Sequence, residues 1–146
     1  MIRAVRHAGI VVEDLERMLA FYCGVLGLER RALANEAGPF VDGLLGFADT
    51  QVTTAKLAAP EGPTLVELLH FTSPPSPPRR PLATNTPGPT HIAFTVADLD
   101  ALRPRLEAAG AVFNAPPALS PDGGVKVAYI RDPEGNFLEL VEPVAR

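Results

Sequence analysis

The chain has 146 residues, of which 47% are hydrophobic and 21% charged, and its formal net charge is −4. A chain of this length can bury a substantial core, and its acidic balance argues against a nucleic-acid partner, whose phosphates favour a basic surface. The single cysteine, Cys23, excludes a disulfide within the chain, and no apolar run approaches the roughly 20 residues that cross a bilayer. Because the residues after Met1 lead into an alternating pattern rather than the apolar core of a signal peptide, we expect a soluble, cytoplasmic protein without membrane partners.

The first predicted elements are a strand and a helix. An alternating pattern of side chains, rich in β-branched residues, predicts a strand over residues 5–12. Asp14 suits the N-cap of the helix that follows, and Gly27 suits the position just past its end. The apolar residues between them recur at helical spacing: Leu15, Met18, Leu19, Tyr22 and Leu26.

Two further strands are predicted before the middle of the chain. Residues 51–57 alternate again, and residues 64–71 form the next strand pattern. The stretch 35–49 is less regular, and we interpret it either as a short helical turn or as a lid-like loop over a pocket.

A proline-rich stretch separates the two halves of the chain. Residues 74–89 contain seven prolines and no apolar periodicity, which is typical of a semi-rigid extended linker. We therefore expect a first module over residues 1–72, a linker over 73–89 and a second module over 90–146.

After the linker the first plan recurs. The predicted helix ends just before Gly110 and contains Pro104, which indicates either a late helix start or a kink. The predicted elements are a strand at 90–96, a helix at 98–109, a short strand at 111–114, a tight turn at 122–124, and strands at 125–131 and 136–142.

The two halves are copies of one pattern. At an offset of 84 residues, His7 matches His91, and the glutamate strands match with Glu67 on Glu139. Internal repetition of this kind predicts two similar modules, each with the order β-α-β-β-β. The histidine and glutamate are 60 residues apart in the first copy and 48 in the second. The excess lies in the irregular region 35–49.

The repeated histidines and glutamates have the chemistry of metal ligands. Strand alternation places His7 and His91 on faces of small residues, opposite bulky apolar faces that suit packing under a helix. Glu67 and Glu139 each have apolar residues two positions away on both sides, and an unpaired buried carboxylate costs several kcal/mol. A shared divalent cation would remove that cost. Core histidines are the alternative, but the matched glutamates favour a metal site.

Other polar residues have simpler explanations. Asp14 and Asp98 repeat because both cap helices, and Asp132 and Asn136 fit a turn that they stabilise by bonding to local backbone. By alternation, His70 faces away from Glu67, so we leave it out of the site. Three side chains of a later strand either line the cavity or form a solvated face: Lys126, Tyr129 and Arg131.

These motifs resemble those of a known family. The segments that carry the resemblance are residues 7–16, 21–28, 65–68, 90–94 and the Asp-Pro-Glu-Gly-Asn-Phe-Leu-Glu-Leu string at 132–140. They resemble the vicinal oxygen chelate superfamily, which includes glyoxalase I, methylmalonyl-CoA epimerase, extradiol dioxygenases and fosfomycin- and bleomycin-resistance proteins. The resemblance covers residues 2–143. It implies an α+β fold in which two βαβββ modules form a curved mixed-sheet cup around a metal.

The resemblance also implies a ligand set. His7 and Glu67 from one module and His91 and Glu139 from the other would bind one divalent metal per site: Zn, Ni, Co, Mn or Fe. The paired modules come from one chain or from two chains of a dimer, and we expect a homodimer. Four filled ligand positions resemble glyoxalase I more than the extradiol dioxygenases, which have two histidines and one carboxylate.

This ligand set favours a metal-dependent lyase or isomerase of the glyoxalase or epimerase type, acting on a small-molecule substrate. The metal would stabilise an enediolate or enolate as a proton leaves the carbon next to a carbonyl. Glu67 or Glu139 would be the base, and the resemblance does not choose between them. The alternatives are an extradiol-type dioxygenase and a non-catalytic protein of the antibiotic-resistance type that binds a small molecule.

Overall fold

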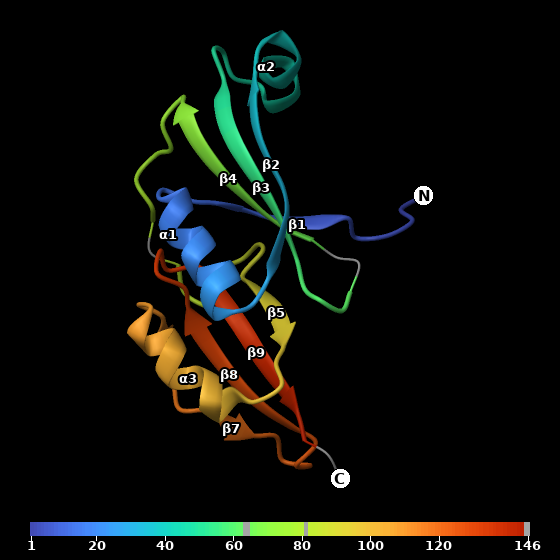
Figure 1. Ribbon diagram of the computed structural model, residues 1–146, viewed down its shortest axis with the longest axis vertical. Helices are drawn as coiled ribbons and strands as arrows, with labels where there is room; N and C mark the ends of the chain where they lie inside the picture. Colours follow the sequence, from blue (N-terminus) through green and yellow to red (C-terminus); the bar gives the residue numbers. More distant parts are fainter. Residues whose placement is uncertain (63–64, 81, 145–146) are drawn as a thin grey trace. The chain divides into compact units, whose positions relative to one another are not determined.

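The structure is a computed structural model that describes residues 1–62, 65–80 and 82–144. The chain divides into two compact units, Met1–Arg79 and Arg80–Arg146. Each unit is built on one mixed sheet with helical segments beside it (Figure 1). Among the described residues, no helix is long and apolar enough to cross a membrane.

The first unit contains a four-stranded sheet in the order β1-β4-β3-β2. β1 pairs with β4 in parallel, and the other pairs are antiparallel. The elements are β1 (His7–Val11), α1 (Leu15–Leu19), the π-helix η1 (Ala20–Val25), β2 (Glu29–Ala37), α2 (Pro39–Leu45), β3 (Gln51–Ala58) and β4 (Leu65–Ser73). The predicted strands are confirmed, although the expected start of the last one at residue 64 lies outside the described residues.

The second unit repeats this plan with the order β5-β9-β8-β6, and β7 pairs with β8 off that path. Its parallel pair is β5 with β9. The elements are β5 (His91–Thr95), α3 (Leu99–Ala108), β6 (Val112–Phe113), β7 (Ala118–Leu119), β8 (Val125–Arg131) and β9 (Phe137–Pro143). The tight turn predicted at residues 122–124 joins β7 to β8. The prediction of two βαβββ modules is confirmed.

Both helices begin where the aspartates predict. The side chain of Asp14 accepts a hydrogen bond from the Arg17 backbone N–H at 3.0 Å, and Asp98 accepts one from Ala101 at 2.9 Å. These caps satisfy backbone donors that the first helical turn leaves free. The helix α3 begins at Leu99 and runs through Pro104, so of the two alternatives, a late start or a kink, the late start is wrong.

The first helix ends just before Gly27, as predicted, but its second half differs in type from the prediction. After α1 the backbone continues as the π-helix η1, in which Leu26 donates to the carbonyl of Phe21 five residues earlier. The wider turn changes which side chains face inward. Phe21 and Tyr22 are both buried, with ring centroids 5.4 Å apart in an edge-to-face arrangement. The helical spacing of apolar residues predicts that Tyr22 is buried but does not predict the burial of Phe21.

The irregular region 35–49 has more structure than the sequence indicates. Its first residues complete β2, a nine-residue strand at the edge of the sheet. A helix follows, as one of the two interpretations expects: α2 lies at the end of the β2–β3 hairpin (Figure 1). β2 is exposed along almost its whole length and has no apolar face, so its sequence lacks the alternation that predicts a strand.

The described part of the linker forms neither helix nor strand between Ser73 and His91. Pro81, one of the seven prolines, lies outside the described residues.

The core of each unit lies on the side of the sheet that faces its helix. In the first unit, α1 contacts β4, and Met18, Leu57 and Leu68 are fully buried. In the second, α3 contacts β9, and Leu106 and Leu140 are fully buried. Each such side chain contributes about 1.5–3 kcal/mol to folding. The repeated histidines and glutamates lie on the opposite face of each sheet.

Candidate metal site

The first half of the candidate site lies on the parallel pair β1–β4. Gly9 is the register partner of Glu67, so the glutamate points to the same face as the alternate residues of β1, including His7. The Nε2 atom of His7 lies 3.1 Å from Oε2 of Glu67. On the other side of β4, the Nζ atom of Lys56 lies 3.7 Å from Oε1 of the same carboxylate.

The second half repeats this geometry on the parallel pair β5–β9. Ala93 is the register partner of Glu139, and the Nε2 atom of His91 lies 3.2 Å from Oε2 of Glu139. The hydroxyl of Tyr129 lies 3.2 Å from the same Nε2 atom. Behind the ring, Oγ1 of Thr90 lies 2.8 Å from Nδ1 of His91. The two predicted His–Glu pairs therefore both exist, each within one unit.

The pairs are partly accessible to solvent. The glutamate side chains are 11% exposed for Glu67 and 22% for Glu139, whereas the histidine side chains are 37% and 32% exposed for His7 and His91. The carboxylates are thus largely buried while the imidazoles open to solvent. A ligand can reach the paired atoms without unfolding the sheet.

The spacing within each pair fits a shared cation. Two ligands about 2.1 Å from one ion lie about 3.0 Å apart at a right angle and about 3.4 Å apart at a tetrahedral angle. The observed 3.1 and 3.2 Å lie in this range. A hydrogen bond from a protonated imidazole nitrogen to the carboxylate has the same length. Imidazole and carboxylate together suit Zn, Ni, Co, Mn or Fe.

Each unit supplies two candidate ligands. Within residues 1–62, 65–80 and 82–144, no three side chains of His, Cys, Asp or Glu gather in one group that could hold a metal. The prediction that His7, Glu67, His91 and Glu139 share one ion therefore stays a prediction.

Three neighbours of the pairs are Lys56, Thr90 and Tyr129. The sequence interpretation missed Lys56 and Thr90. For Tyr129 it left two alternatives open, a side chain that lines the cavity or one on a solvated face. A signal for Lys56 existed: it is a charged residue between Ala55 and Leu57 in the interior of a strand. Burial of Tyr129 and then the nearby carboxylate of Glu139 raise the pKa of the tyrosine.

The residues that the sequence excluded have structural contacts. His70 lies with its Nδ1 atom 3.3 Å from the carbonyl oxygen of Val12. Asp132 is 2% exposed and accepts a hydrogen bond from the side-chain amide of Asn136 at 2.7 Å, which holds the turn before β9. Cys23 is half-buried, and burial raises the pKa of its thiol.

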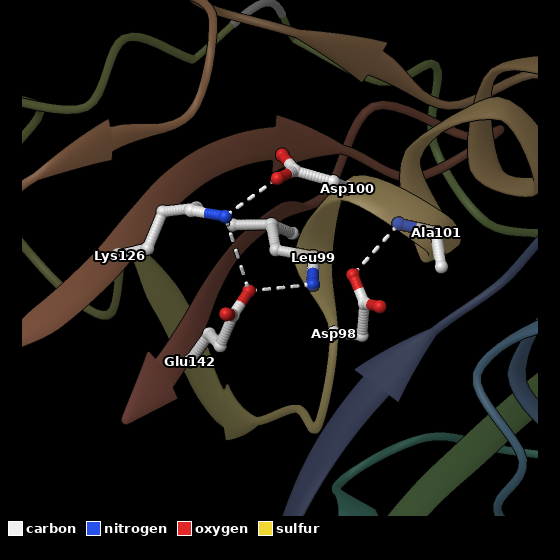
Figure 2. A network of polar contacts seen from close by, with 6 residues as sticks. All are labelled: Asp98, Leu99, Asp100, Ala101, Lys126 and Glu142. Atoms are coloured by element: carbon white, nitrogen blue, oxygen red, sulfur yellow. Dashed lines mark hydrogen bonds and ion pairs between the residues drawn. The ribbon is translucent and has the colours of Figure 1, made fainter. Parts of the chain in front are cut away.

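Lys126 belongs to the opposite face of the sheet. Its Nζ atom lies 2.6 Å from Oδ2 of Asp100 and 3.7 Å from Oε2 of Glu142, and that glutamate oxygen also accepts a hydrogen bond from the Leu99 backbone N–H at 2.7 Å (Figure 2). The hydrogen bond to Asp100 raises the pKa of Lys126. This network joins β8 and β9 to the first turn of α3, so the interpretation of Lys126 as a cavity residue is wrong.

The network makes a stability prediction. Replacing Glu142 by alanine removes the acceptor of a helix N-terminal N–H, and we expect the free energy of unfolding to fall by about 1–2 kcal/mol. Glu142→Gln keeps an oxygen at that position and should lose less. Urea unfolding followed by circular dichroism measures both variants. Equal stability of Glu142→Ala and the unchanged chain would show that the contact contributes nothing.

Comparison with known proteins identifies the family. The chain matches the Glyoxalase/Bleomycin resistance protein/Dioxygenase superfamily over residues 4–140, and it belongs to that superfamily. This confirms the resemblance and the glyoxalase/dioxygenase-like fold with its paired βαβββ modules.

Individual relatives cover nearly the whole chain. A crystal structure of a glyoxalase family protein from Bacillus cereus is 28% identical, with a TM-score of 0.90 over 99% of this chain and 96% of that one. The uncharacterized protein YaeR of Escherichia coli strain K12 is 30% identical over 97% of both chains. A probable lactoylglutathione lyase of Vibrio cholerae is 26% identical over 93% of this chain and 88% of the relative.

Proposed function

We propose that this protein is a metal-dependent lyase or isomerase that moves a proton on the carbon next to a carbonyl of a small, oxygen-rich substrate. The observation that carries the proposal is the duplicated His–Glu pair, at 3.1 Å on β1–β4 and 3.2 Å on β5–β9. The relation to a probable lactoylglutathione lyase supports the same reaction type. Family membership alone does not select it, because the superfamily also includes resistance proteins and dioxygenases.

Different residues of the chain would bind the metal, transfer the proton and position a ligand. His7, Glu67, His91 and Glu139 would hold the cation, and the bound cation would supply a Lewis acid that stabilises negative charge on two neighbouring substrate oxygens. One of the glutamates would accept the proton from carbon and return it. Thr90 would keep the ring of His91 in place through its Nδ1 atom, as partners of metal-binding histidines commonly do.

Exchange of substrate hydrogen with solvent tests the reaction type. The purified protein, loaded in turn with Zn, Ni, Co or Mn, is incubated in D2O with α-hydroxy carbonyl compounds, with the hemithioacetal of methylglyoxal and glutathione, and with 2-methyl-branched thioesters. We expect deuterium at the carbon next to the carbonyl of at least one substrate, visible by NMR, only when metal is present.

Parallel samples with other substrates and metals separate the alternatives. Oxygen consumption with catechols and Fe(II), without deuterium exchange, would indicate an extradiol-type dioxygenase instead. Tight binding of a small molecule with neither exchange nor oxygen uptake would indicate a binding protein. Either outcome would refute the proposed reaction.

A further inference from the structure

Arg131 lies on the same face of the second sheet as the candidate ligands. On β9, Phe137 is the register partner both of His91 on β5 and of Arg131 on β8. Register partners point to one face of a sheet, so these three side chains form a row across the strands. Glu139 follows Phe137 by two positions on β9 and points to the same face. The row therefore runs directly beside the His91–Glu139 pair.

An aromatic contact holds the guanidinium of Arg131 in this row. Its Cζ atom lies over the ring of Phe137, 4.8 Å from the ring centroid. A guanidinium within about 6 Å of an aromatic face is attracted by the electron density of the ring. Phe137 is 4% exposed, whereas the arginine is exposed. The contact thus places the charge over β9, one strand from His91, and leaves the side chain open to solvent.

The charge of Arg131 is available to a ligand. Other arginines of the chain have a carboxylate partner: Arg31 lies 2.7 Å from Glu29. Arg103 likewise lies 2.9 Å from Glu107. Across residues 1–62, 65–80 and 82–144, no aspartate or glutamate forms an ion pair with Arg131. A planar guanidinium binds a carboxylate or a phosphate through two parallel hydrogen bonds, so either group would suit this position.

The first unit has no charge at the equivalent position. Leu65 on β4 is the register partner of His7 and also of Ala58 on β3. The row beside His7 therefore ends in alanine where the row beside His91 ends in arginine. An anionic group would be bound next to His91 and not next to His7, which makes the two otherwise similar halves of the site chemically different.

We propose that Arg131 binds an anionic group, a carboxylate or a phosphate, that the substrate carries close to its two metal-binding oxygens. Neighbouring strands lie about 4.8 Å apart, so one small molecule can reach both the guanidinium over β9 and a cation at His91. This inference rests on the proposed function, because it requires the cation. It narrows the substrate to small hydroxy or keto acids, or phosphorylated compounds of similar size, rather than neutral carbonyl compounds.

Binding of three hydroxamates tests the anion site without turnover. Acetohydroxamate has an uncharged tail, succinate monohydroxamate ends in a carboxylate, and phosphonoacetohydroxamate ends in a phosphonate; all three offer a metal the same two oxygens. The protein is loaded with Co(II), whose visible absorption reports metal binding, and calorimetry at constant ionic strength measures hydroxamate affinity. We expect at least one anionic ligand to bind about tenfold more tightly than acetohydroxamate, equivalent to about 1.4 kcal/mol. The tighter of the two distinguishes a carboxylate from a phosphate.

Two variants assign this preference to one residue. Arg131→Gln should abolish it, while the affinities for cobalt and for acetohydroxamate stay within about threefold. Arg103→Gln is the matched control, because that guanidinium also lies over a phenylalanine ring, that of Phe113 at 5.1 Å, but belongs to α3 on the other side of the sheet. It should keep the full preference. The net charge of −4 disfavours anions in general, so a preference for them requires a local cation.

The outcomes separate this proposal from the one on which it rests. Equal affinity of the unchanged protein for all three hydroxamates, with cobalt bound, would overturn the anion site and leave the proposed function intact. A preference that persists in Arg131→Gln would overturn the assignment to this arginine. Loss of cobalt affinity in Arg131→Gln would assign the side chain to the packing of β9 and would also overturn the proposal. Failure of the unchanged protein to bind cobalt would overturn both.

Discussion

Replacing by glutamine whichever of Glu139 and Glu67 serves as the base is expected to lower turnover by at least about a hundredfold while the protein stays folded. A glutamine keeps the size of the side chain but cannot accept a proton from carbon, and a positioned acid–base group contributes about 10²–10⁴ to a rate. It is also a weaker metal ligand than a carboxylate. The measurement is the deuterium-exchange rate at saturating metal, so that weaker metal binding does not account for the loss.

The matched control is Glu142→Gln. Glu142 lies on the same strand as Glu139, three residues further on, and its carboxylate contacts Leu99 and Lys126 on the helix side of the sheet. This variant should keep turnover within about twofold. If only one of Glu67→Gln and Glu139→Gln lost turnover at saturating metal, that glutamate would be the base and the other only a ligand. Full activity in both would exclude the acid–base role of the glutamates.

Removing either repeated histidine is expected to weaken metal binding by more than about a hundredfold. His7→Ala and His91→Ala each delete a nitrogen that lies beside a carboxylate at 3.1 or 3.2 Å. Mutating even the outer partners of metal ligands costs about 10–100-fold in affinity, so losing a ligand itself should cost more. Competition with a chromophoric chelator measures the affinity.

The third histidine of the chain provides the control for this prediction. His70 contacts the carbonyl oxygen of Val12 rather than a carboxylate. His70→Ala should bind metal as tightly as the unchanged protein, even if its stability falls. Equal affinity of all three alanine variants would mean that the histidines are not ligands.

The sequence predicts the repeated parts of the fold well because they have strong local patterns. Alternation predicts β1 and β5, and the aspartate caps predict where α1 and α3 begin. Alternation also places His7 and Glu67 on particular faces of their strands. The parallel register that brings them to 3.1 Å involves residues about 60 positions apart, and no local pattern contains that information.

The sequence predicts less where the two copies differ. β2 is an exposed edge strand of charged and small residues, so nothing in its composition separates it from a loop or helix. Lys56 and Tyr129 occupy equivalent register positions but share no chemistry, so a search for repeated residues passes over both. The structure was therefore needed to show that residues 29–37 form a strand. It was also needed to show that Lys56 and Tyr129 lie beside the His–Glu pairs.

The number of metal ions bound per chain tests the central claim most directly. The protein is loaded with Zn or Co, freed of excess metal by gel filtration, and analysed for metal and protein in the same fractions. We predict one ion per chain, whether the two half-sites meet within one chain or across two chains of a dimer. We also predict that His7→Ala and His91→Ala lose it. No bound ion, or two ions per chain with each variant losing only one, would contradict a single site built from His7, Glu67, His91 and Glu139.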